Sequence, residues 1–217
     1  MQTKDLRDNI SLLTMGPRPI IIPSVNNGII IDYMAINHVL LSMAYTLRPK
    51  KDEKGHLFED VLIAELTNSG IKLWECKKKL KHLDGSSKEI DVSFIHKGIL
   101  FIAELKANGR SITYIEGNNQ ALNYRKGKIR DAIKQVESKA DWILTHLKGT
   151  NYYVPENINI IIPFIVTPFV EYIWSDDPNL WFNSRTPRIC TPNECCGLCT
   201  PEIENDILSK PFIRLVR

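Results

Sequence analysis

Residues 89–107 read EIDVSFIHKGILFIAELKA, two apolar runs joined by Lys97-Gly98. A two-residue connection that contains glycine is typical of a tight β-hairpin, because glycine readily adopts the positive φ angles that such turns need. We therefore expect strands over 89–96 and 99–107. The second run begins with five consecutive apolar residues, 99–103, as a strand buried on both faces of a sheet does.

Charged residues lie at the end of this second strand. Side chains alternate between the two faces of a strand, so Glu104 and Lys106 share one face. Charges at the end of a buried strand cost free energy unless they find partners or a metal ion. In the simplest register of the hairpin, Asp91 comes near Glu104, and we expect two carboxylates and one ammonium group to meet.

Such a group of side chains predicts a site for Mg²⁺ or Mn²⁺. Two close carboxylates raise one another's pKa, and a divalent cation removes the conflict by binding oxygens of both. Magnesium uses few protein carboxylates and leaves positions for water and phosphate, whereas a zinc site would normally include His or Cys. Metal activation of water, with Lys106 orienting that water or stabilising charge, is the chemistry of phosphodiester hydrolysis.

The flanking segments predict an α/β fold. An apolar stripe at 57, 58, 61, 62 and 66 indicates a helix that ends near Asn68-Ser69-Gly70, with Glu59 beside the stripe. A polar loop is expected through 124, after a strand at 111–115, and a long amphipathic helix from about 128. The prolines within 158–172 favour one or two strands near a sheet edge. We expect a core at 55–175 with a mixed sheet and helices on both faces, an N-terminal extension (1–54, strand plus helix) packing on it, and a C-terminal extension (176–217).

These residues resemble the signature of the PD-(D/E)xK nuclease superfamily, the restriction-endonuclease-like proteins. Asp91 matches the first acidic position, and Glu104 and Lys106 match E-x-K, although Ile90 replaces the proline of the PD pair. The resemblance implies that Glu59, on the first core helix, completes the metal shell and that Gln135, on the later helix, supports the site. The order of elements is closest to the nuclease-related (NERD) and Mrr-like branches. The expected function is a Mg²⁺-dependent DNA endonuclease, and the resemblance also implies a homodimer.

Basic residues favour a polyanionic partner only locally, because the net charge is just +3. Lys78, Arg110, Lys126 and Lys128 are candidates for holding a phosphate backbone, which gives affinity without sequence preference. The alternative is that these side chains form solvated, solubilising faces.

Four of the five cysteines, Cys190, Cys195, Cys196 and Cys199, lie within ten residues. A metal knot is one interpretation, but Thr191-Pro192-Asn193-Glu194 predicts a helix start there, and buried thiols in a reducing cytoplasm are the alternative we favour. The five histidines include no H-x-x-x-H pair, so the sequence itself indicates no zinc hydrolase. The apolar runs are too short to span a bilayer.

Two other functions remain open at this point. One is a nuclease-like module that has lost cleavage and only binds nucleic acid or a protein. The other is a structural or regulatory domain that assembles through its extensions.

Overall fold

The computed structural model describes residues 21–23, 29–31, 51–109, 111–115, 117–171, 177–182, 186–197 and 213–216. The chain divides into two compact units, Met1–Pro49 and Lys50–Arg217. In the first unit, β1 (Ile21–Pro23) and β2 (Ile29–Ile31) form an antiparallel pair. The helix expected in the N-terminal extension lies outside the described residues.

The second unit is built on a mixed sheet. Its strands run in the order β10-β8-β7-β6-β3, and β9 also pairs with β8. The bounds are β3 (Lys72–Leu73), β6 (Val92–His96), β7 (Ile99–Leu105), β8 (Ile160–Val166), β9 (Ile189–Cys190) and β10 (Arg214–Leu215). The β7–β8 and β8–β9 pairs are parallel and the others antiparallel.

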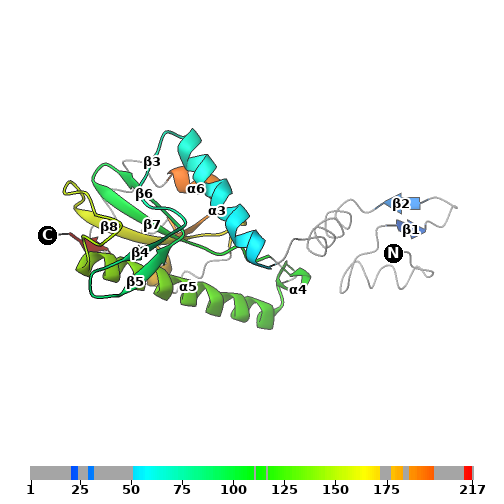
Figure 1. Ribbon diagram of the computed structural model, residues 1–217. Coiled ribbons are helices and arrows are strands. Elements are labelled where there is room, and N and C mark those ends of the chain that lie inside the picture. The colour runs from blue at the N-terminus through cyan, green and yellow to red at the C-terminus, as the bar shows by residue number, and fades with distance from the viewer. Residues whose placement is uncertain are drawn as a thin grey trace. The chain divides into compact units, whose positions relative to one another are not determined.

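Helices cover both faces of this sheet, as expected (Figure 1). Helices α3 (Lys51–Asn68) and α6 (Pro192–Gly197) lie on one face, and α5 (Asn119–Thr145) lies on the other. A separate two-stranded sheet consists of β4 (Lys78–Lys81) and β5 (Ser87–Ile90). The remaining elements are the single helical turn α4 (Ile112–Ile115) and the 3-10 helix η1 (Pro178–Leu180). The predicted α/β class is therefore confirmed.

The core has two layers because β7 alternates its apolar side chains. Phe101 and Ala103 pack on the side of α3, while Leu100 and Ile102 pack on the side of α5. On the α3 side, the rings of Phe94 and Phe101 stack with centroids 4.8 Å apart. Since Glu104 follows Leu100 and Ile102 at the same spacing, its side chain emerges on the face that α5 covers.

The apolar stripe of α3 is narrower than the sequence suggests. Phe58, Leu62 and Leu66 are buried, but Leu57 is 57% exposed and Val61 is 51% exposed. The expected end of the helix is confirmed, since α3 stops at Asn68 and Gly70 follows with φ 72°.

The central hairpin forms as predicted. Its register runs from His96↔Ile99 to Val92↔Ala103, and Lys97 and Gly98 have φ angles of 46° and 77°, the two positive values of a type I′ turn. One feature differs, because the strand expected over 89–96 is broken. Asp91 stands at a bend between β5, which pairs with β4, and β6, which joins the main sheet.

The long helix begins earlier than expected. Instead of a polar loop through 124, α5 starts at Asn119, capped by the side chain of Asn118, whose Oδ1 accepts from the backbone N–H groups of Gln120 and Ala121 at 3.0 and 3.2 Å. Residues 112–115 form α4, not a strand. The first expectation was wrong because the Asn118 cap starts α5 before its apolar periodicity begins. In α4, the hydroxyl of Ser111 accepts from the backbone N–H of Tyr114 at 3.2 Å and so caps a helical turn where a strand was expected.

Strand β8 lies next to the edge strands of the sheet, near the edge as its prolines predicted, but it is itself paired on both sides. It lies between β7 on one side and β9 and β10 on the other. The missing N–H of Pro163 lies on the side of β9 and β10, between the stretches that these two short strands pair. There the guanidinium group of Arg188 donates to the carbonyl of Pro163 at 3.1 Å, so this carbonyl is paired without a neighbouring strand.

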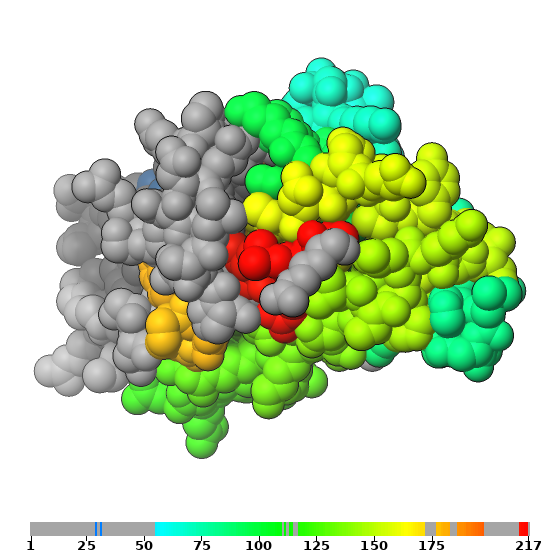
Figure 2. Space-filling model, turned by 90° about the vertical axis from the view of Figure 1, so that its left-hand side faces the viewer, coloured from blue at the N-terminus to red at the C-terminus, as the bar shows by residue number. Residues whose placement is uncertain are grey.

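The C-terminal strand completes the sheet at the surface. Figure 2 shows β10 (red) beside the yellow segment that leads into β8. The backbone N–H of Val216 extends this contact by donating to Asn159 O at 2.8 Å.

The cysteine-rich segment contains the predicted helix start. Glu194 Oε2 accepts from the backbone N–H and the hydroxyl of Thr191 at 2.8 and 2.9 Å, and α6 begins at Pro192. Cys190 and Cys195 are buried free thiols, while Cys199 lies outside the described residues. A hydrogen bond with Cys190, together with burial, raises the pKa of Cys195 and so favours its thiol form.

Candidate active site

Two acidic side chains meet where the central hairpin is held against α5. Val92 pairs with Ala103, so Asp91 stands opposite Glu104 at the open end of the hairpin. The carboxylate of Asp91 is fixed by the backbone N–H of Leu105, which donates to Oδ2 at 2.9 Å. Both side chains are largely buried, Asp91 with 16% and Glu104 with 7% exposed. The convergence expected from the sequence is therefore present.

Lys106 and Gln135 lie at the same place. Lys106 follows β7 and continues its pairing, since its backbone N–H donates to Val166 O at 3.0 Å. Its ammonium group donates to Glu104 Oε1 at 2.7 Å and to Gln135 Oε1 at 2.8 Å. Gln135 lies on α5, 29 positions from Lys106 in the sequence, and its side-chain oxygen orients the lysine.

A second lysine, Lys139, was not identified from the sequence. Its ammonium group lies between the two carboxylates: it donates to Asp91 Oδ1 at 2.9 Å and forms an ion pair with Glu104 Oε2. Only 13% of its side chain is exposed. The signal was available, because Lys139 lies one helical turn after Gln135 and therefore on the same face of α5.

The charges of the site are strongly coupled. Burial raises the pKa of Asp91, and Glu104 adds to this effect, although Lys139 and the Leu105 N–H act in the opposite direction. Burial alone would lower the pKa of Lys139, but the two carboxylates outweigh it and raise that pKa. The environment of Asp91 thus opposes its ionisation even with the ammonium group of Lys139 in contact.

The donor set fits a hard divalent cation. Asp91 and Glu104 offer carboxylate oxygens and no nitrogen or sulfur ligand, which is the preference of Mg²⁺ or Mn²⁺. The position of the Lys139 ammonium group, in contact with both carboxylates, marks where positive charge is stabilised in this fold. A metal ion there would take over part of the charge compensation that Lys139 supplies.

Glu59 lies on α3, where its side chain is close to His56 and Lys77. Its Oε2 is 3.3 Å from His56 Nδ1 and 3.9 Å from Lys77 Nζ. The link to the site is indirect, since the backbone N–H of Lys77 donates to Asp91 O at 2.8 Å. The role of Glu59 in metal binding stays a prediction.

The four residues expected to hold a phosphate backbone are in different situations. Lys128 lines a small pocket together with Lys106 and Asn108, and its Nζ lies 5.4 Å from the ring centre of Tyr124. Lys78 is paired with Glu75 at 2.8 Å. Lys126 lies on α5, and Arg110 lies outside the described residues. Lys128 is thus the candidate placed beside the acidic site.

The first turns of α5, which carry Lys126 and Lys128, are anchored by a buried ion pair. Arg125 is buried, and its Nε donates to Glu171 Oε2 at 3.0 Å. The hydroxyl of Tyr114 donates to the same oxygen at 3.1 Å. These contacts fix the helix that brings Lys128 and Gln135 to the site.

Comparison with known proteins identifies one relationship. A family model described as "Nuclease-related domain" (NERD) matches residues 41–168, more than half of the chain. The matched segment contains all the site residues described above from Glu59 to Lys139. Comparisons with curated proteins and with solved structures gave no match. Among the residues that the structure describes, no helix is long and apolar enough to cross a membrane.

Proposed function

The chain belongs to the nuclease-related domain (NERD) family, with a restriction-endonuclease-like α/β fold, and on this premise we propose that it is a divalent-metal-dependent endonuclease that hydrolyses phosphodiester bonds of DNA. One observation carries the proposal: Asp91, Glu104 and Lys106 converge at the end of β7, with Gln135 holding the lysine. The fold alone would not require a lysine bonded to both an acid and an amide at this place.

The residues of the chain have separate tasks. Asp91 and Glu104 would hold Mg²⁺ or Mn²⁺, with Glu59 contributing directly or through water. When bound, the ion supplies activation of water and stabilisation of charge on the phosphate. Lys106, with its ammonium group fixed by Glu104 and Gln135, donates a hydrogen bond to the attacking water or to a phosphate oxygen.

Lys128 supplies the first contact with the polyanionic substrate. It lies beside Lys106 in the same small pocket, so a phosphate group that reaches Lys106 passes close to it. Such a contact contributes affinity without reading the base sequence. DNA as the substrate, a homodimer that cuts both strands and a reducing, cytoplasmic location for the thiols of Cys190 and Cys195 belong to the proposal as well.

One observation favours a second candidate, a module that binds nucleic acid or a protein without cutting. Lys139 already forms ion pairs with both Asp91 and Glu104. A site in which this ammonium group stays in place permanently needs no metal ion and lacks a means to activate water. The two candidates therefore differ in whether a metal can enter against Lys139.

Cleavage assays separate them. Purified protein is incubated with supercoiled plasmid, single-stranded DNA and RNA, each with Mg²⁺, with Mn²⁺ or with chelator. We expect metal-dependent nicking of the plasmid, and loss of at least about a hundredfold in rate for Lys106→Ala, because one preorganised charge contact is removed. Lys134→Ala is the matched control, since Lys134 is an exposed lysine of the same helix α5 as Gln135.

Two results would contradict the nuclease assignment. One is a Lys106→Ala protein that cuts at the wild-type rate, which would trace the activity to a contaminant or to another site. The other is a wild-type protein that binds DNA and cuts none of the three substrates with either metal, which is the behaviour of the second candidate.

A further inference from the structure

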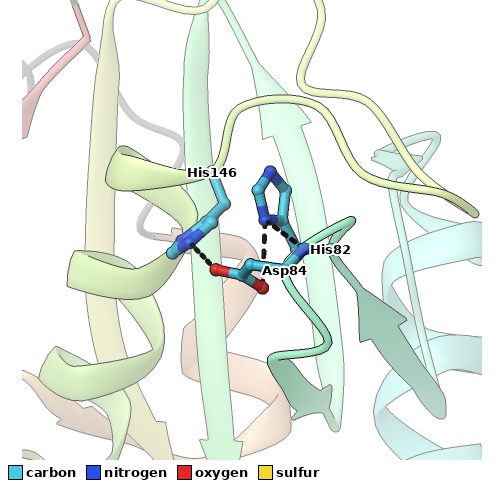
Figure 3. Close-up of side chains that lie close together, drawn as sticks. All are labelled: His82, Asp84 and His146. Atoms are coloured by element: carbon cyan, nitrogen blue, oxygen red, sulfur yellow. Dashed lines mark hydrogen bonds and ion pairs between the residues drawn. The ribbon is translucent and has the colours of Figure 1, made fainter.

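A second group of metal-ligating side chains lies apart from the acidic site. His82 and Asp84 come from the turn between β4 and β5, and His146 caps the C-terminal end of α5 (Figure 3). One ligand atom from each of the three residues lies within 4.8 Å of the other two. His82 and His146 are 64 positions apart in the sequence, so only the fold brings them together.

The carboxylate of Asp84 bridges the two imidazole rings. Its Oδ1 is 3.1 Å from His82 Nδ1, and its Oδ2 is 3.2 Å from His146 Nε2. The ring centres are 4.3 Å apart. In Figure 3 both rings turn a nitrogen toward the same carboxylate, as the dashed lines show.

Backbone groups lie close to the ring nitrogens. His146 Nδ1 lies 2.8 Å from the carbonyl oxygen of Trp142, which can only accept, so a proton on Nδ1 suits this contact. His82 Nδ1 lies 3.4 Å from the backbone nitrogen of Asp84. The two nitrogens that face Asp84, His82 Nδ1 and His146 Nε2, can each bind a proton, which then forms a hydrogen bond to the carboxylate, or a metal ion.

From this geometry we propose that His82, Asp84 and His146 bind a zinc-class transition-metal ion at a site distinct from the acidic one. Two imidazole nitrogens and one carboxylate oxygen form a ligand set that zinc uses and magnesium does not prefer. Tetrahedral bonds of ~2.0–2.1 Å place neighbouring ligand atoms ~3.3 Å apart. The separations of 3.1 and 3.2 Å, which end on different oxygens of Asp84, are close to that value, and the three ligand atoms all lie within 4.8 Å of one another.

The surroundings hold the ligands in position. Asp84 Oδ1 accepts from the backbone N–H of Ser86 at 2.7 Å. The ring of Trp142 stacks on His146 with centroids 4.8 Å apart, and its Nε1–H donates to Ser86 Oγ at 3.0 Å. A ligand histidine that donates its second N–H to a backbone carbonyl is the usual arrangement around protein-bound zinc. Asp84 is about half exposed, which leaves the fourth position to water.

The ion would connect two segments that carry the acidic site. Strand β5 leads directly into Asp91, and α5 carries Gln135 and Lys139. A metal that ties the β4–β5 turn to the end of α5 therefore fixes the distance between these residues. Its effect is structural, and it does not depend on whether the acidic site cuts DNA.

Zinc titration calorimetry on the full chain tests the proposal. The protein is stripped with chelator, dialysed, and titrated with ZnCl₂ while excess Mg²⁺ occupies the acidic site. We expect one Zn²⁺ per chain. Asp84→Asn and His146→Ala should each lose at least about tenfold in affinity, since each removes a ligand.

Two variants serve as controls, one for misfolding and one for non-specific Zn²⁺ binding. Asp84→Asn keeps the side-chain oxygen that accepts from Ser86, so the turn is retained, and circular dichroism should match the wild type. His56→Ala removes an exposed histidine outside the cluster and should bind Zn²⁺ as the wild type does. Absence of Zn²⁺ uptake by the wild type, or equal affinity in wild type, Asp84→Asn and His146→Ala, would overturn the proposal.

Discussion

Replacing Lys139 with methionine probes the charge balance of the acidic site most directly. The variant keeps roughly the length of the side chain and removes an ammonium group that contacts both carboxylates. Removing one partner of a buried ion pair costs about 3–5 kcal/mol, because the remaining charge is left without compensation. Lys106 still pairs with Glu104 at 2.7 Å, so we expect the lower end, a loss of about 3 kcal/mol in the free energy of unfolding without metal.

The assay is urea unfolding followed by circular dichroism, with chelator and with Mg²⁺. An ion that binds only the folded state stabilises it by about 2.7 kcal/mol at a hundred times its dissociation constant. In the variant this gain should restore nearly all of the loss. In the wild type the gain should be smaller, since Mg²⁺ must first displace the ammonium group of Lys139 from the carboxylates.

Lys134→Met is the control, because it removes an exposed lysine of α5 and should change the free energy of unfolding by no more than about 0.5 kcal/mol. If Lys139→Met is as stable as the wild type in chelator, Lys139 does not compensate the charge of the buried carboxylates. The prediction is also refuted if Mg²⁺ stabilises both proteins equally, since Lys139 and the metal would then not compete for the same carboxylates.

Three further changes test other parts of the structure. Glu59→Gln should lower the rate of plasmid nicking by about tenfold or more and raise the Mg²⁺ concentration needed for half-maximal rate; an unchanged metal requirement would remove Glu59 from the site. Gly149→Ala should destabilise the fold by about 1–3 kcal/mol, because a Cβ there would collide with the ring of Tyr152 and with a backbone carbonyl; Gly55→Ala, where nothing lies within 4 Å, should be neutral or stabilising in thermal unfolding. Lys128→Ala should weaken binding to DNA of any sequence and reduce the slope of log affinity against log salt by about one, and a loss confined to one sequence would argue against a phosphate contact.

Local sequence patterns determined the turns and helix ends, because the conformation there depends on residues that are close together in the chain. The Lys97-Gly98 turn set the register of the hairpin, and that register placed Asp91 opposite Glu104. The same local logic predicted the end of α3 at Asn68 and the start of α6 at Pro192. The start of α5 was predicted several residues too late, because the capping signal of Asn118 was not used.

Contacts between distant segments decided the rest, because their free energy depends on packing that no sequence window contains. Pro163 is typical of an edge strand, yet β8 is paired on both sides. The proline is tolerated because β9 and β10 pair with other residues of β8, and Arg188 donates to its carbonyl. Lys139 reads as one lysine among many, and only the docking of α5 on the sheet brings its ammonium group between Asp91 and Glu104. Likewise, His82 and His146 share no spacing motif, and they meet only because the β4–β5 turn packs at the end of α5.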